Sequence, residues 1–158
     1  MREIKFRAWH KGKKIMGEVL GIDILHKEMF FSNENINCYE YTEFKDIELM
    51  QYTGLKDMRE KEIYEGDILL SSNENGIFLI SINFGDSNIE DSNILTCFQI
   101  KIEKTLAESQ YLEYFNNNLI KLINKYNIPL EEYNNEKYIS DGWLILGNIY
   151  KNPELLGE

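Results

Sequence analysis

Two segments in which apolar residues recur at every second position constrain the fold of this chain more than any other feature. Phe78, Ile80, Ile82 and Phe84 have this period within residues 77–84, and Ile94, Thr96, Phe98, Ile100 and Ile102 repeat it. A period of two places these side chains on one face of an extended strand. The residues between the two segments are mostly polar, so the sequence predicts a long β-hairpin.

Two turns are predicted in the centre of the chain, each with a glycine. Gly54 follows an apolar-rich strand that is expected to stop there, and Gly66-Asp67 precedes the apolar start of another strand. Because glycine adopts positive φ angles that other residues resist, we interpret Gly54, Gly66 and Asp67 as structural turn residues.

The N-terminal part of the chain is predicted to be a small β-meander. Residues 4–9 alternate between apolar side chains and basic or aromatic ones, and short strands are expected at residues 15–16, 19–25 and 29–31. Residues 38–44 are aromatic but also charged, a pattern that is typical of either a strand or a short helix.

Three sequence blocks together resemble one known family. They are MREIKFRAWH at the start, LMQYTGLKDMREKEIYEGD in the centre and LGNIYKNPELL near the end. In this order and over nearly the whole chain, the blocks are similar to the YopX family of phage and prophage proteins. The resemblance implies an N-terminal β-meander subdomain (residues 1–54) beside a Src-homology-3-like small β-barrel (residues 55–158). With the helix that the residues themselves predict, we expect a mainly β fold with one helical insertion at about residues 103–141. The resemblance also implies no established activity, so no catalytic residues are transferred.

One segment within this insertion is predicted to be a long helix. Thr105 and Glu108 have the spacing of a capping box, and apolar side chains recur at steps of three and four up to Tyr126, before Asn127 ends the pattern. The helix predicted at residues 105–126 has a continuous apolar stripe that must be covered. We favour packing on its own barrel; the alternative is packing on the same helix of a second subunit.

Basic residues are concentrated at the start of an otherwise acidic chain. The formal net charge is −10, yet residues 1–16 hold six basic side chains against Glu3. Candidate binding residues from this segment are Arg2, Lys5, Arg7, Trp9, Lys13 and Lys14. A basic segment beside an acidic body can steer self-assembly or attract a partner, while the acidic body repels nucleic acid. The alternative is that both are solvated faces without a partner.

Motifs of known catalytic or nucleotide-binding sites are absent from the sequence. It contains no P-loop, GxGxxG, GxSxG, HExxH or CxxC pair. A carboxylate cluster of Asp57, Glu65 and Asp67, or a hydrolase that uses Glu65 and Asp67, is an alternative, but acidic neighbours are common in so acidic a chain. We therefore expect no enzyme activity and no cofactor.

Metal, disulfide and membrane features are not expected either. Cys38 and Cys97 lack a metal-ligand spacing, which predicts two reduced thiols. The acidic loop with Asp86, Glu90 and Asp91 lacks the regular ligand spacing of a calcium-binding loop. Apolar runs fall well short of the roughly 20 residues of a spanning helix, so we expect a cytoplasmic protein without membrane contact.

These observations favour a phage or prophage accessory protein that acts by binding. We expect a non-enzymatic protein-binding module that self-associates as a homo-oligomer, with a host or phage protein as a second candidate partner. The alternative is a nucleic-acid-directed protein, which either binds DNA or RNA or mimics DNA to block a host protein.

Overall fold

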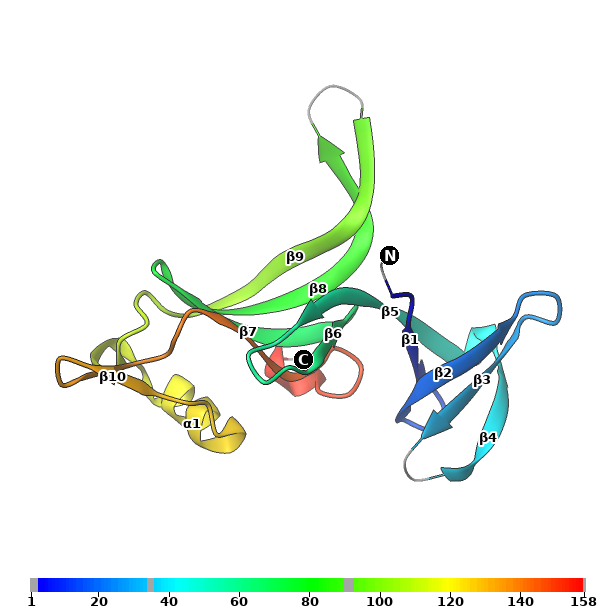
Figure 1. The fold of residues 1–158 in the computed structure, drawn as a ribbon, viewed down its shortest axis with the longest axis horizontal. Helices are drawn as coiled ribbons and strands as arrows, with labels where there is room; N and C mark the ends of the chain where they lie inside the picture. The colour runs from blue at the N-terminus through cyan, green and yellow to red at the C-terminus, as the bar shows by residue number, and fades with distance from the viewer. Residues whose placement is uncertain (1–2, 34–35, 90–92, 158) are drawn as a thin grey trace.

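The computed structural model of the chain describes residues 3–33, 36–89 and 93–157. Within these ranges the strands form a six-stranded sheet, a four-stranded sheet and a small two-stranded one. The N-terminal sheet lies at one end of the molecule and the helix at the other, with the four-stranded sheet between them (Figure 1). The prediction of a mainly β fold is therefore confirmed.

The six-stranded sheet has the order β4-β3-β2-β1-β5-β6, and its neighbouring strands are antiparallel. Its strands are β1 (Phe6–His10), β2 (Ile15–Asp23), β3 (Glu28–Asn33), β4 (Ile36–Glu43), β5 (Ile47–Lys56) and β6 (Glu62–Tyr64). The predicted meander is confirmed, although the two strands expected at residues 15–16 and 19–25 form one strand, β2, that ends at Asp23. Ala8 of β1 and Met29 of β3 pack with Ile47 of β5. The segment at residues 38–44 forms most of β4 and then enters the 3-10 turn η1 (Phe44–Asp46).

The sequence predicts that the strand stops at Gly54. This prediction is wrong, because β5 continues to Lys56. Its pairing with β6 shifts register between Tyr52 and Lys56, and Gly54 lies within this irregularity with a φ of 88°. The glycine therefore has the positive φ that was expected, but it allows a bulge in the strand rather than the end of the strand.

The four-stranded sheet has the order β12-β7-β8-β9. Its strands are β7 (Asp67–Asn73), β8 (Gly76–Ile89), β9 (Asn93–Ala107) and β12 (Gly142–Asn148). The predicted long hairpin is confirmed, since β8 and β9 pair from Ile77 opposite Ala107 to Ile89 opposite Asn93. The expected barrel is not closed, because β12 and β9 remain the two edges of an open sheet among the described strands.

The helix α1 (Asn117–Tyr126) is much shorter than the sequence predicts. Thr105 of the apparent capping box belongs to β9, where it pairs with Phe78, and Glu108 directly follows the end of that strand at Ala107. Pairing with a distant strand thus overrides the local helix signal. The side chain of Asn116 caps the helix instead, because its Oδ1 accepts from the amides of Asn118 and Leu119 at 3.0 and 2.9 Å.

The end of α1 and its packing both agree with the sequence. Asn127 has a left-handed conformation with a φ of 49°, which ends the helix. Leu119 and Ile123 pack in the largest core cluster together with residues of β7 and β8 such as Leu70. The helix therefore covers its own chain, as favoured above. The remaining elements are η2 (Leu112–Tyr114), the hairpin β10 (Glu131–Tyr133) and β11 (Glu136–Tyr138), and η3 (Pro153–Leu155).

Candidate functional site

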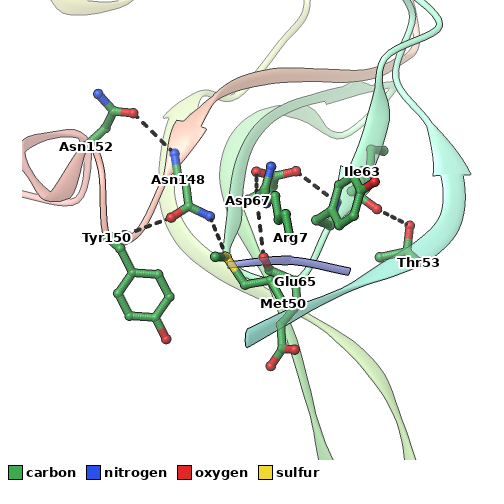
Figure 2. A network of polar contacts seen from close by, with 10 residues as sticks. Arg7, Met50, Thr53, Ile63, Glu65, Asp67, Asn148, Tyr150 and Asn152 are labelled. Carbon is green, nitrogen blue, oxygen red and sulfur yellow. Dashed lines mark hydrogen bonds and ion pairs between the residues drawn. The ribbon is translucent and has the colours of Figure 1, made fainter. Parts of the chain in front are cut away.

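A buried ion pair joins the two large sheets. Arg7 on β1 pairs with Asp67 at the start of β7, and its Nη2 also donates to the carbonyl oxygen of Glu65 at 3.4 Å (Figure 2). The guanidinium lies 4.8 Å from the centroid of the Tyr64 ring, and the Tyr64 amide donates to the second oxygen of Asp67 at 2.9 Å. Arg7 therefore holds the turn between β6 and β7 against the N-terminal sheet.

Burial dominates the electrostatics of Asp67, whose side chain is only 1% exposed. Loss of solvation raises the pKa of Asp67 above its ordinary value, while the charge and hydrogen bond of Arg7 and the amide of Tyr64 act in the opposite direction. The carboxylate is thus costly to bury, and Arg7 and the Tyr64 amide offset part of that cost.

Asn148, at the end of β12, connects the C-terminal turn to the same junction. Its side-chain amide donates to the sulfur of Met50 at 3.4 Å, and its Oδ1 accepts from the Tyr150 amide at 3.0 Å (Figure 2). Its backbone amide donates to Asn152 at 3.3 Å. Strands from three parts of the sequence therefore meet in one polar network.

A cleft of about 650 Å³ opens beside this junction, and we call it the junction cleft. Its walls come from β1, the β1–β2 turn, β2, β3, β6 and the segment after β12. The lining side chains include Arg7, Trp9, Lys14, Met16, Glu18, Ser32, Glu62, Tyr64 and Lys151. A smaller hollow of about 260 Å³ shares Arg7, Met16 and Lys151 with it. The cleft is therefore polar, and both signs of charge line it.

Some of these charges are already neutralised within the protein. Glu62 accepts from the Lys5 ammonium at 2.5 Å and from the Tyr64 hydroxyl at 2.8 Å. Lys5 and then Tyr64 are the main reasons that the pKa of Glu62 lies below its ordinary value. The ammonium groups of Lys14 and Lys151 have no hydrogen bond or ion pair within the described part of the chain.

A second candidate surface is the face of the four-stranded sheet that points away from α1, which we call the outer face. It carries Phe78, Ile80, Ile82, Phe84, Phe98, Ile100, Ile102, Trp143 and Ile145. The side chains of Phe84, Ile100 and Ile102 are 44%, 53% and 62% exposed. A groove of about 370 Å³ on this face is lined by apolar, serine and asparagine side chains and by no charged residue.

The β8–β9 hairpin also extends beyond the rest of its sheet. β7 pairs with β8 only as far as Ser81, and the Ile82 carbonyl accepts from the Gly66 amide at 2.7 Å. Farther along, the described part of β8 pairs with β9 alone and forms an arm that projects from the molecule (Figure 1). The arm therefore lacks the support of a wider sheet. An isolated two-stranded hairpin is only marginally stable in water.

Comparison with known proteins places the chain in a family. The profile described as YopX protein matches residues 5–157. The chain belongs to the YopX family. A search among curated proteins finds no match. A crystal structure of protein EF1440 from Enterococcus faecalis is similar at 24% identity, with 99% of each chain covered and a TM-score of 0.46.

The candidate binding residues of this YopX-family protein are dispersed rather than gathered on one free surface. Lys5 and Arg7 form ion pairs with Glu62 and Asp67, and Trp9 is buried. Lys13 and Lys14 lie in the exposed β1–β2 turn, and of the two only Lys14 lines the junction cleft. Arg2 lies outside the described residues. Their role in binding stays a prediction.

Gly66 and Asp67 lie in the turn between β6 and β7, whereas Gly54 lies in the bulge of β5. Gly66 has a φ of 75°, and Asp67 closes the turn through the Tyr64 amide. Asp57, which sequence reasoning considered as part of a carboxylate cluster, instead accepts from the amides of Arg59, Lys61 and Ile145. It therefore stabilises a loop and joins that loop to β12.

The predictions about metals, thiols and membranes can be compared with the structure only in part, because some of the residues concerned lie outside the described ranges. Within the described part, no group of three or more His, Cys, Asp or Glu side chains has a geometry that would hold a metal ion. Cys97 is a free thiol, whereas the side chains of Cys38, Asp86, Glu90 and Asp91 lie outside the description. Among the described helices, none is long and apolar enough to span a bilayer.

The sequence reasoning missed the residues that complete the junction cleft. Lys151 lies in a turn after the last strand, and Glu62 and Tyr64 lie on a strand of three residues. Their local pattern carries no signal of a cleft, because the walls meet only when the N-terminal sheet packs against the turn before β7. The outer face did have a signal, namely the period of two in β8 and β9.

Proposed function

We propose that this YopX-family protein is a non-enzymatic accessory protein of a phage or prophage that acts by protein binding and self-associates through the outer face. The observation that carries the proposal is the exposure of Phe84, Ile100 and Ile102 on one continuous apolar face. Exposed apolar patches of this kind are rare on monomers and commonly mark interaction sites.

A second copy of the chain is the occupant that the charges favour. The protein has a net charge of −10, so two copies repel each other over most of their surfaces. The groove on the outer face contains no charged side chain, and two such faces can therefore meet without placing like charges together. A two-fold contact also uses the same patch on both copies, which suits a uniformly apolar surface.

The shape of the hairpin supports the same proposal. β9 is an edge strand, and beyond Phe84 no third strand among those described lies beside the β8–β9 arm. Contact with a second copy would cover its apolar side chains and supply the packing that a two-stranded ribbon lacks.

Direct binding of nucleic acid is less well supported. Three of the basic side chains near the N-terminus are engaged with carboxylates, since Lys5, Arg7 and Lys11 pair with Glu62, Asp67 and Glu48. Few cations then remain to contact a phosphate backbone from this segment.

Light scattering on purified protein tests self-association. We expect the wild type to have a mass of at least two chains, and the double variant Ile100→Lys/Ile102→Lys to have the mass of one chain with an unchanged circular dichroism spectrum. A matched control is Ile24→Lys/Leu25→Lys, which adds the same charge at an exposed turn of the N-terminal sheet. A monomeric wild type across a wide range of concentration contradicts the proposal, as does an outer-face variant that keeps the wild-type mass.

A further inference from the structure

The junction cleft contains more cationic side chains than its carboxylates neutralise. Arg7, Lys14 and Lys151 line it, together with the carboxylates Glu18 and Glu62. Glu62 is held by Lys5 and Tyr64. Only Glu18 therefore remains to balance Lys14 and Lys151, neither of which has an ion pair among the described residues.

Arg7 adds positive charge to this arrangement. Its Nη2 is occupied by Asp67 and the Glu65 carbonyl oxygen. Its Nε is buried and has no hydrogen-bond partner among the described residues, so this donor is closed to the cleft and Arg7 acts there through its charge.

The three cationic side chains come from separate segments of the chain. Arg7 is on β1, Lys14 is in the β1–β2 turn and Lys151 follows β12. Donors on three separate walls suit a tetrahedral anion, whose oxygens point in several directions, better than a planar carboxylate, which is matched by a single guanidinium fork. A volume of about 650 Å³ is also in the range of small-molecule sites, which is roughly 300–1,000 Å³.

From these observations we infer that the junction cleft binds a small molecule bearing a phosphate group, with Lys14 and Lys151 as its principal contacts. The Arg7 guanidinium adds positive charge to the wall of the cleft, and Glu18 limits the affinity by repulsion. This inference is independent of self-association, because the cleft and the outer face share no residue.

Nuclear magnetic resonance titration of the full chain with inorganic phosphate tests the site. We expect amide shifts concentrated in residues 14–18 and at Lys151, which are absent when sodium chloride is added to the same ionic strength. Citrate, a carboxylate anion, is expected to bind at least about tenfold more weakly than pyrophosphate, because planar carboxylates match the three walls less well.

Three variants make the test specific. Lys14→Gln/Lys151→Gln is expected to weaken phosphate binding by about tenfold or more, and Glu18→Gln to tighten it. The matched control Lys104→Gln/Lys121→Gln removes the same charge from a hollow beside α1 and is expected to leave the affinity unchanged. Circular dichroism checks that each variant is folded.

The outcomes that overturn the inference are equally specific. Equal weakening by the two double-lysine variants would show that phosphate responds only to net charge. Amide shifts scattered over many surface lysines would also contradict a built site, as would citrate that binds as tightly as pyrophosphate. A Glu18→Gln variant that does not bind phosphate more tightly than the wild type would contradict it as well.

Discussion

The two faces of the four-stranded sheet are formed by the same strands, yet one of them is covered and the other is covered only in part. On the covered face, Leu70, Leu79 and Leu144 pack with Leu119 and Ile123 of α1 in the largest core cluster. On the outer face, Ile80 and Ile82 are buried, but Ile100 and Ile102 remain more than half exposed. Consecutive apolar residues in β8, such as Phe78 and Leu79, make both faces apolar. The course of the chain after β9 decides which face the helix closes.

The helix of the chain packs where the four-stranded sheet is widest. α1 packs where β7, β8, β9 and β12 lie side by side, whereas the arm extends beyond β7 and β12. A helix of ten residues is roughly 15 Å long and is too short to cover the arm as well.

The largest expected effect comes from opening the covered face. Leu119→Ala is expected to lower the free energy of unfolding by about 2–5 kcal/mol, because Leu119 is fully buried and leaves a cavity. Ile102→Ala on the outer face is expected to change it by only about 0.5 kcal/mol or less in dilute, monomeric protein. Urea unfolding followed by circular dichroism measures both. Equal losses in the two variants would mean that the outer face is as closed as the covered one.

An intermediate effect is expected from Gly54 and Gly66. They differ as the two faces do, because Gly66 is packed against other residues and Gly54 is not. Gly66→Val and Gly54→Val each place a β-branched residue at positive φ, at a cost of about 1–3 kcal/mol. The loss at Gly66 should be the larger, because an added Cβ lies 3.0 Å from the Asn148 side chain, whereas nothing lies within 4 Å at Gly54. Thermal unfolding of both variants measures the difference, and wild-type melting of Gly66→Val would refute the turn assignment.

The smallest expected effect is the difference between the pKa values of two aspartates, one buried and one exposed. Each of them pairs with a basic side chain. The pKa of Asp67 is raised by burial despite Arg7, whereas the pKa of the exposed Asp23 is lowered by its hydrogen bond with His26. Carboxyl resonances followed against pH are expected to titrate above the ordinary aspartate value for Asp67 and below it for Asp23.

The two aspartates then contribute to stability over opposite pH ranges. The contribution of Asp67 is present below its unfolded-state pKa and is lost as pH rises through its raised folded-state pKa. The contribution of Asp23 is present above its unfolded-state pKa and is lost as pH falls through its lowered folded-state pKa. Titration of both residues on the same side of the ordinary value would show that burial does not separate them.

The sequence predicted those features that depend on neighbouring residues. The period of two in β8 and β9 was sufficient for the hairpin, the positive φ of Gly54 and Gly66 follows from the absence of a side chain, and Asn127 ends α1 as expected. The predicted start of the helix was wrong because it depends on residues that are distant in the sequence. Thr105 pairs with Phe78 in a neighbouring strand, and no local pattern reports that pairing.

The residues of the candidate sites show the same division. Local sequence was sufficient to predict a mainly β chain with an apolar β8–β9 face and basic first residues. The packing of distant segments brings Lys5 and Arg7 to carboxylates 57 and 60 positions away, and places Lys14 and Lys151 in one cleft. The physical reason is that strand period and turn geometry depend on a few adjacent residues, whereas ion pairs, clefts and covered faces depend on which distant segments pack together.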